Sequence, residues 1–99
     1  MTSALRHETS KTVVLVADTE TAVDLGSQIK AFQIQARDNT VIRLAFDPGQ
    51  TVDNGPYWTI KAGAKWPVES WPLPLAGSNR VIYLRAVGAG ATAEIVTQI

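Results

Sequence analysis

Apolar and polar residues alternate along two neighbouring stretches of the chain. The pattern covers Ile29–Ala36 and Val41–Phe46, and the turn-forming residues Arg37–Thr40 separate the two stretches. A period of two is typical of β-strands, because successive side chains point to opposite faces of a sheet. The spacing therefore predicts an antiparallel hairpin with one apolar face and one polar, solvent-exposed face. Its apolar face would carry Phe32, Ile34, Ala36, Ile42, Leu44 and Phe46.

Other short apolar segments follow, separated by turn-forming residues. The β-branched run Thr12–Ala17 predicts a first strand that is covered on both faces or lies against a neighbouring subunit. Asp47–Pro56 has the composition of a loop, because Pro48 fixes its backbone at a turn position and Gly49 and Gly55 can adopt positive φ. Further strands are expected over Ala22–Gly26, Tyr57–Lys61, Arg80–Val87 and Thr92–Ile99.

The segment Lys65–Leu75 holds three prolines, which cannot donate to a β-ladder, so we expect an edge strand or a covering loop there. Short strands at this spacing predict an all-β fold, either a small antiparallel β-sandwich or a jelly-roll-like barrel of about seven or eight strands. One parity of the strands supplies the expected core. It comprises Phe32, Ile34, Ile42, Leu44, Phe46, Ile60, Ile82 and Leu84.

The 99 residues suit one domain, which at this size buries roughly two-thirds of the surface of the unfolded chain. Residues 1–11 are polar and follow neither period, so we expect a flexible N-terminal arm before a single domain over residues 12–99. Leu5 is the only sizeable branched apolar residue of that arm. We expect the arm to be mobile in the free protein and to become ordered on a partner.

Composition argues against several classes of protein. The chain has no cysteine, and nine basic residues balance nine acidic ones without forming blocks. A disulfide scaffold is therefore excluded, and binding to nucleic acid or to an anionic membrane is not expected. The longest apolar run, Val13–Ala17, is too short to cross a bilayer, so we expect a soluble protein made in a cytoplasm.

No catalytic or cofactor signature emerges from the motifs. The single histidine, His7, lies in the expected arm and cannot serve as the rigid base of a Ser-His-Asp triad or complete a zinc site. Asp47, Asp53 and Asn54 could offer oxygens to Ca²⁺, but turn formation is the favoured interpretation. Gly88–Gly90 lacks the ending of a phosphate-binding loop. We therefore expect no enzyme, metal or cofactor, although sequence leaves open how the carboxylates meet in space.

Four aromatic residues, Tyr57, Trp58, Trp66 and Trp71, lie within fifteen positions. They are interpreted first as core or edge packing, second as anchors of a protein interface, and last as rings that stack on sugars. Coplanar exposure would favour the sugar interpretation, and burial would favour packing. The candidate interface comprises Leu5, Trp66, Trp71, Leu73 and Leu75.

One combination of segments runs along the chain in a fixed order: the opening β-branched strand, Ile29–Arg37, Tyr57–Gly63, and the closing strands Val81–Val87 and Ala93–Val96. In this composition and strand order, residues 12–99 resemble small virion structural proteins of tailed bacteriophages. The resemblance implies a non-enzymatic β-sandwich that resides on the virion, most plausibly as a capsid decoration (cement) protein. The implied partners are the major capsid protein or another virion protein and further copies of the chain, for example in a trimer. The alternatives are a head–tail or tail component, or a carbohydrate-binding or receptor-recognition module that uses Trp66 and Trp71.

Overall fold

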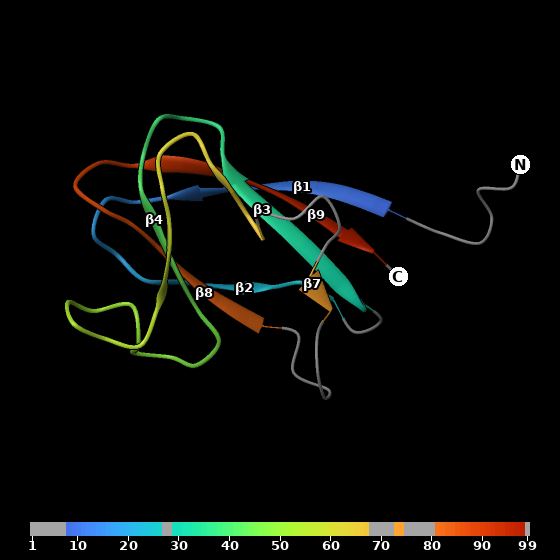
Figure 1. Cartoon of the computed structure of the whole chain (residues 1–99), viewed down its shortest axis with the longest axis horizontal. Helices are drawn as coiled ribbons and strands as arrows, with labels where there is room; N and C mark the ends of the chain where they lie inside the picture. Colours follow the sequence, from blue (N-terminus) through green and yellow to red (C-terminus); the bar gives the residue numbers. More distant parts are fainter. Residues whose placement is uncertain (1–7, 27–28, 68–72, 75–80, 99) are drawn as a thin grey trace, which may run out of the picture.

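The computed structural model describes residues 8–26, 29–67, 73–74 and 81–98. Within these ranges the regular structure is entirely β, and the strands form two antiparallel sheets that pack face to face (Figure 1). The expected small antiparallel β-sandwich is therefore confirmed.

The first sheet has the order β1-β9-β3, and two very short strands, β6 and β7, both pair with the outer edge of β3. The second sheet has the order β2-β8-β4-β5. The strands of the first sheet are β1 (Glu8–Leu15), β9 (Ala91–Gln98), β3 (Ala31–Ala36), β6 (Lys65–Trp66) and β7 (Leu73–Pro74). Those of the second are β2 (Thr21–Asp24), β8 (Val81–Ala86), β4 (Ile42–Ala45) and β5 (Trp58–Ile60).

The apolar core fills the space between the two sheets. The expected core residues are all fully buried except Phe46, which is half-buried and packs against the rest. Burial follows the predicted alternation closely, as in β8 and β9, where every second side chain is buried. Further core positions come from Leu15, Val23, Leu25, Ile29, Ala86, Ala91, Ala93 and Ile95.

The prediction that the two alternating stretches form a hairpin is wrong. β3 lies in the first sheet and β4 in the second, so the two strands face each other across the core instead of sharing hydrogen bonds. The rings of Phe32 and Phe46 meet edge to face with centroids 6.4 Å apart. Alternation shows that each strand has one apolar face, but it does not show whether two such strands pair by their edges or by their faces. Residues 37–40 can extend about 13 Å, which is enough to link sheets about 10 Å apart.

The N-terminal boundary also needs correction. β1 begins at Glu8, so residues 8–11 belong to a strand and not to the expected arm. The physical reason is the length of β9, which supplies a paired residue for each of them, from Gln98 opposite Glu8 to Ile95 opposite Lys11. Leu5 and the remainder of the expected arm lie outside the described residues.

In the described part of the chain, the opening strand is covered on one face only. Val14 and Val16 expose 76% and 64% of their surface, whereas Leu15 between them is buried. Beyond β1 the chain crosses to the second sheet, where Ala17 forms an isolated parallel bridge with Ala86. The N–H of Asp18 donates to the Ala86 carbonyl at 2.7 Å, which ties this crossing to β8.

The proline-rich segment occupies a sheet edge, as its composition predicts. β6 and β7 each pair with β3 through two residues, and Pro74 stands opposite Ala31. Residues 68–72 and 75–80 lie outside the described part, which includes the expected interface residues Trp71 and Leu75.

Loss of side-chain volume at the centre of the sandwich should destabilise the fold strongly. Leu44 is completely buried, so Leu44→Ala should lower the free energy of unfolding by roughly 2–5 kcal/mol, measured by chemical denaturation. Val52→Ala, a truncation at an exposed loop position, is the matched control and should change it by less than about 0.5 kcal/mol. Equal effects of the two truncations would contradict the described core.

Candidate functional site

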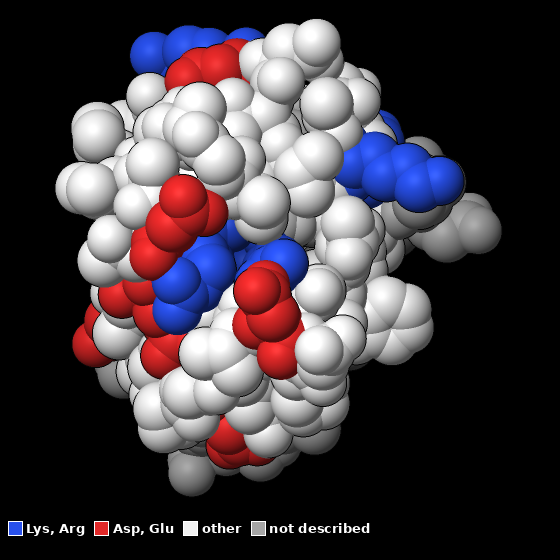
Figure 2. Space-filling view, turned by 90° about the vertical axis from the view of Figure 1, so that its left-hand side faces the viewer, with Lys and Arg blue, Asp and Glu red and all other residues white. Residues whose placement is uncertain are grey.

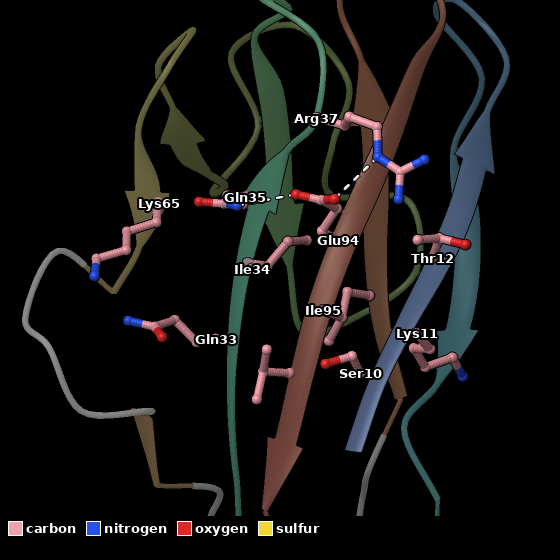
Figure 3. Close-up of a pocket in the computed structure, with 11 residues that line it drawn as sticks. Ser10, Lys11, Thr12, Gln33, Ile34, Gln35, Arg37, Lys65, Glu94 and Ile95 are labelled. Carbon is pink, nitrogen blue, oxygen red and sulfur yellow. Dashed lines mark hydrogen bonds and ion pairs between the residues drawn. The ribbon is translucent and has the colours of Figure 1, made fainter. Parts of the chain in front are cut away.

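The outer face of the first sheet is hollowed by an open depression of about 400 Å³ that spans β1, β9, β3 and β6 (Figure 3). Because side chains alternate along each strand, the residues between the buried core positions point into it. The polar residues that line it from these strands are Ser10, Lys11, Thr12, Gln33, Gln35, Lys65 and Glu94.

Strand register places four of these side chains in one row across the sheet. Thr12 lies opposite Glu94, Glu94 opposite Gln35, and Gln35 opposite Lys65. Figure 3 shows this row, with Glu94 at its centre. Directly opposed residues in antiparallel strands have Cβ atoms about 5 Å apart, so their side chains interact. The row therefore forms one continuous polar surface.

Glu94 organises this surface through its two carboxylate oxygens. Oε1 accepts a hydrogen bond of 2.9 Å from Gln35 Nε2, and Oε2 accepts one of 2.9 Å from Arg37 Nε. The Gln35 amide first, and Arg37 next, lower the pKa of Glu94 below its usual value. The group is thus a carboxylate at neutral pH, and its charge is balanced from within the chain.

The hollow is open and does not enclose a small molecule. Drug-sized ligands usually occupy concave pockets that cover most of their surface. An open row of donors and acceptors on a rigid sheet is better suited to a large surface, such as that of another protein, where polar groups form the rim of an interface.

A second polar cluster covers the outer face of the second sheet, where Arg43 of β4 stands directly opposite Arg85 of β8. Opposed like charges are unfavourable in a sheet. Arg43 donates from Nη1 to the Thr51 carbonyl at 2.9 Å and forms an ion pair of 2.8 Å with Asp53, while its guanidinium lies 4.5 Å from the centre of the Tyr57 ring. Figure 2 shows basic groups in a shallow hollow bordered by acidic groups.

Thr51 is the buried centre of this cluster. Its hydroxyl donates to Glu20 and accepts from Arg85 Nε at 3.1 Å, while Glu20 also accepts from the Gly49 N–H at 2.8 Å. The Thr51 hydroxyl, followed by the Gly49 N–H, lowers the pKa of Glu20. Because each charge meets a protein partner, we assign this cluster a structural role: it fastens loop 47–57 to the sheet.

The loop backbone is shaped for this attachment. Gly49 has a φ of 81°, as its position in the sequence predicts, whereas Gly55 is required for a different reason. A Cβ on Gly55 would lie 2.2 Å from the Gln50 carbonyl oxygen, so no other residue fits. Of the loop residues considered for Ca²⁺, Asp53 is paired with Arg43 and Asn54 occupies a turn position with a φ of 63°. The described residues contain no group of three or more side chains suited to hold a metal.

Trp66 seals the gap between the sheets. Its ring lies 5.8 Å from Phe32, 6.1 Å from Phe46 and 6.0 Å from Trp58, with interplanar angles between 41° and 52°. These tilted contacts agree with the packing interpretation and form no coplanar platform for sugars. Trp58 covers this cluster from outside and exposes 59% of its surface.

The expected interface residues are brought together only in part. Trp66 and Leu73 lie in the two short strands that share the edge of β3, while Leu5, Trp71 and Leu75 fall outside the described residues. The sequence does not predict the bonds of Glu94 to Gln35 and Arg37. That link depends on the register between residues more than fifty positions apart, which no local pattern encodes.

None of the three comparisons with known proteins yields a match: no family model, no curated protein and no solved structure is similar to this chain. Likewise, no helix among the described residues is long and apolar enough to span a membrane.

The Glu20 contacts should make stability dependent on pH. The pKa of Glu20 in the folded protein lies below its ordinary value of 4.5. Its contacts therefore stabilise the fold fully above pH 4.5, and this stabilisation is lost as the pH falls through the folded-state pKa. Glu20→Gln should therefore lower the free energy of unfolding by about 1–3 kcal/mol at pH 7, and by much less at pH 3.

Urea denaturation at both pH values measures this difference. Asp47→Asn removes an exposed acid from the same loop and should cost less than about 0.5 kcal/mol at either pH. A loss for Glu20→Gln that is the same at pH 3 and pH 7 would contradict the assigned hydrogen bonds.

Proposed function

We propose that this chain is a non-enzymatic structural protein that binds other protein molecules through open, rigid sheet surfaces. The observation that carries the proposal is the polar row across β1, β9, β3 and β6, because it spans the width of a sheet and its central charge is balanced within the chain. A partner that covers Glu94 therefore need not supply the opposite charge. It can exchange hydrogen bonds with groups that the fold already holds in place.

The more specific proposal is a capsid decoration protein of a tailed bacteriophage, located on the virion. It rests on the resemblance of residues 12–99 to small virion structural proteins. Two features of the chain support it: a small β-sandwich offers a broad face for its size, and equal numbers of acidic and basic residues avoid strong repulsion between neighbouring copies on a lattice. A head–tail or tail component would use the same surfaces.

The test pairs two lysines that differ in position. Lys65 is exposed and lines the hollow, whereas Lys61 is exposed and does not line it. Capsids assembled from the major capsid protein of the same genome are mixed with purified protein and pelleted, and the bound fraction is measured. Lys65→Glu should weaken binding about tenfold or more, because it replaces the basic end of the row with a second acid, on the other side of Gln35 from Glu94. Lys61→Glu should bind like the unmodified chain.

Three outcomes would go against the proposal. Absence of the unmodified chain from the capsid pellet would reject the decoration role, and equal binding of the two lysine variants would reject the hollow as the contact surface. Saturable binding to an immobilised glycan, without binding to capsids, would instead favour the carbohydrate-recognition alternative.

A further inference from the structure

β1 is an edge strand whose free backbone groups can be identified from its neighbours. The Thr92 carbonyl accepts from the Arg37 N–H at 2.8 Å, and the Gln98 carbonyl accepts from the Lys30 N–H at 2.7 Å. In an antiparallel strand, the N–H and C=O of one residue point to the same neighbour, and this direction alternates along the chain. The N–H and C=O groups of the even-numbered residues of β9 therefore point to β3, and those of its odd-numbered residues point to β1.

The same alternation applies to β1. The register pairs Val13 with Ala93 and Leu15 with Ala91, so the odd-numbered residues of β1 bond to β9. The N–H and C=O groups of Ser10, Thr12 and Val14 consequently point away from the sheet. Within the described part of the chain, no backbone partner for these groups is found.

From Ser10 to Val16, the side chains that project from the outer face of this edge are uncharged and partly apolar. Ser10, Thr12, Val14 and Val16 project from the outer face, and the two valines are among the most exposed large apolar residues of the described structure. The lysine of this stretch, Lys11, directs its ammonium to the Asp24 carbonyl in the other sheet, at 3.0 Å. Between Ser10 and Val16 the edge thus lacks the outward-pointing charge that usually protects an exposed strand from pairing.

The other described edges are short. β2 and β5 have four and three residues, and β6 and β7 have two each, with Pro74 in β7. Short strands and prolines discourage pairing with another chain. β1, with eight residues, is therefore the edge best able to accept a further strand.

We propose that β1 pairs with β1 of a second copy of this chain, antiparallel and about a two-fold axis perpendicular to the first sheet. Such an axis keeps the outer faces of both copies on the same side. The residues with free backbone groups are the even-numbered ones, whose side chains point outward. In this arrangement each even-numbered residue lies opposite an even-numbered residue of the second copy, so their N–H and C=O groups can form hydrogen bonds with each other. In a two-fold contact a charge near the axis would meet its own copy, so an uncharged edge fits a second copy particularly well.

The register with Thr12 on the axis uses the whole run from Ser10 to Val14. It places Ser10 opposite Val14 of the second copy and Thr12 opposite Thr12, so that every free group of these residues is bonded. An axis at Val13 would place Ser10 opposite Val16, whose carbonyl already accepts from the Thr19 N–H at 3.3 Å. An axis at Val14 would leave Ser10 without an opposed residue in β1. Because Ser10 and Thr12 also line the hollow, this dimer would bring the two hollows side by side on one face.

Two variants test the interface by sedimentation equilibrium over a range of concentrations. Thr12→Pro removes an N–H that points to the free edge and leaves the ladder with β9 intact. Val14→Lys places a charge beside the axis, and Val52→Lys, at another exposed valine, is its matched control. We expect the unmodified chain and Val52→Lys to dimerise equally, and both edge variants to raise the dissociation constant about tenfold or more.

A disulfide provides a second readout, because the chain has no native cysteine. Opposed residues of a hydrogen-bonded pair have Cα atoms about 5.5 Å apart, a distance that a disulfide can span. Under mild oxidation Thr12→Cys should form a covalent dimer, and Val52→Cys should not. Circular dichroism and the melting temperature confirm that each variant is folded.

A chain that stays monomeric at the highest reachable concentration would overturn the inference, as would a dimer unaffected by both edge variants. Failure of Thr12→Cys to crosslink would overturn the proposed register. The inference stands apart from the proposed function, because dimerisation is measured on the purified chain without capsids.

Discussion

The packing of two apolar sheet faces against each other is the interaction on which the rest of this molecule depends. Without disulfides in the chain, the side chains around Phe32, Leu44 and Ile95 hold the two layers together mainly through burial. Burying a large aliphatic or aromatic side chain contributes about 1.5–3 kcal/mol, and the cost of deletion rises where the surroundings cannot collapse. Both outer surfaces are rigid because their strands are anchored from beneath by this core.

Charged side chains on the two outer faces find their partners in different ways. On the first sheet, Gln35 of β3 and Arg37, which follows this strand, donate hydrogen bonds to Glu94, and the face stays open. On the second, the opposed Arg43 and Arg85 would repel each other, and loop 47–57 folds over them with carboxylate, carbonyl and hydroxyl oxygens. The covered face therefore serves the fold, and the open face is available for a partner.

The alternating pattern predicted most of the strands and about half of the core, because burial in a sandwich follows the two-residue period of the backbone. The same pattern could not distinguish a hairpin from two strands in different sheets, since Phe32 and Leu44 lie on apolar faces in either arrangement. It also missed the strand at Glu8–Lys11, whose polar residues are held by pairing with β9. The burial of Thr51 was equally invisible, because it depends on Glu20 and Arg85 from distant segments.

Residue-resolved amide hydrogen exchange tests the central claim most directly, namely that β1 is a firmly attached strand with an unpaired outer edge. In dilute solution the amides of Val13 and Leu15 should exchange slowly and those of Thr12 and Val14 quickly, because only the former bond to β9. At high concentration, pairing of two copies should slow the exchange of Thr12 and Val14. Uniformly fast exchange along β1, or exchange at Thr12 and Val14 that is independent of concentration, would contradict this account.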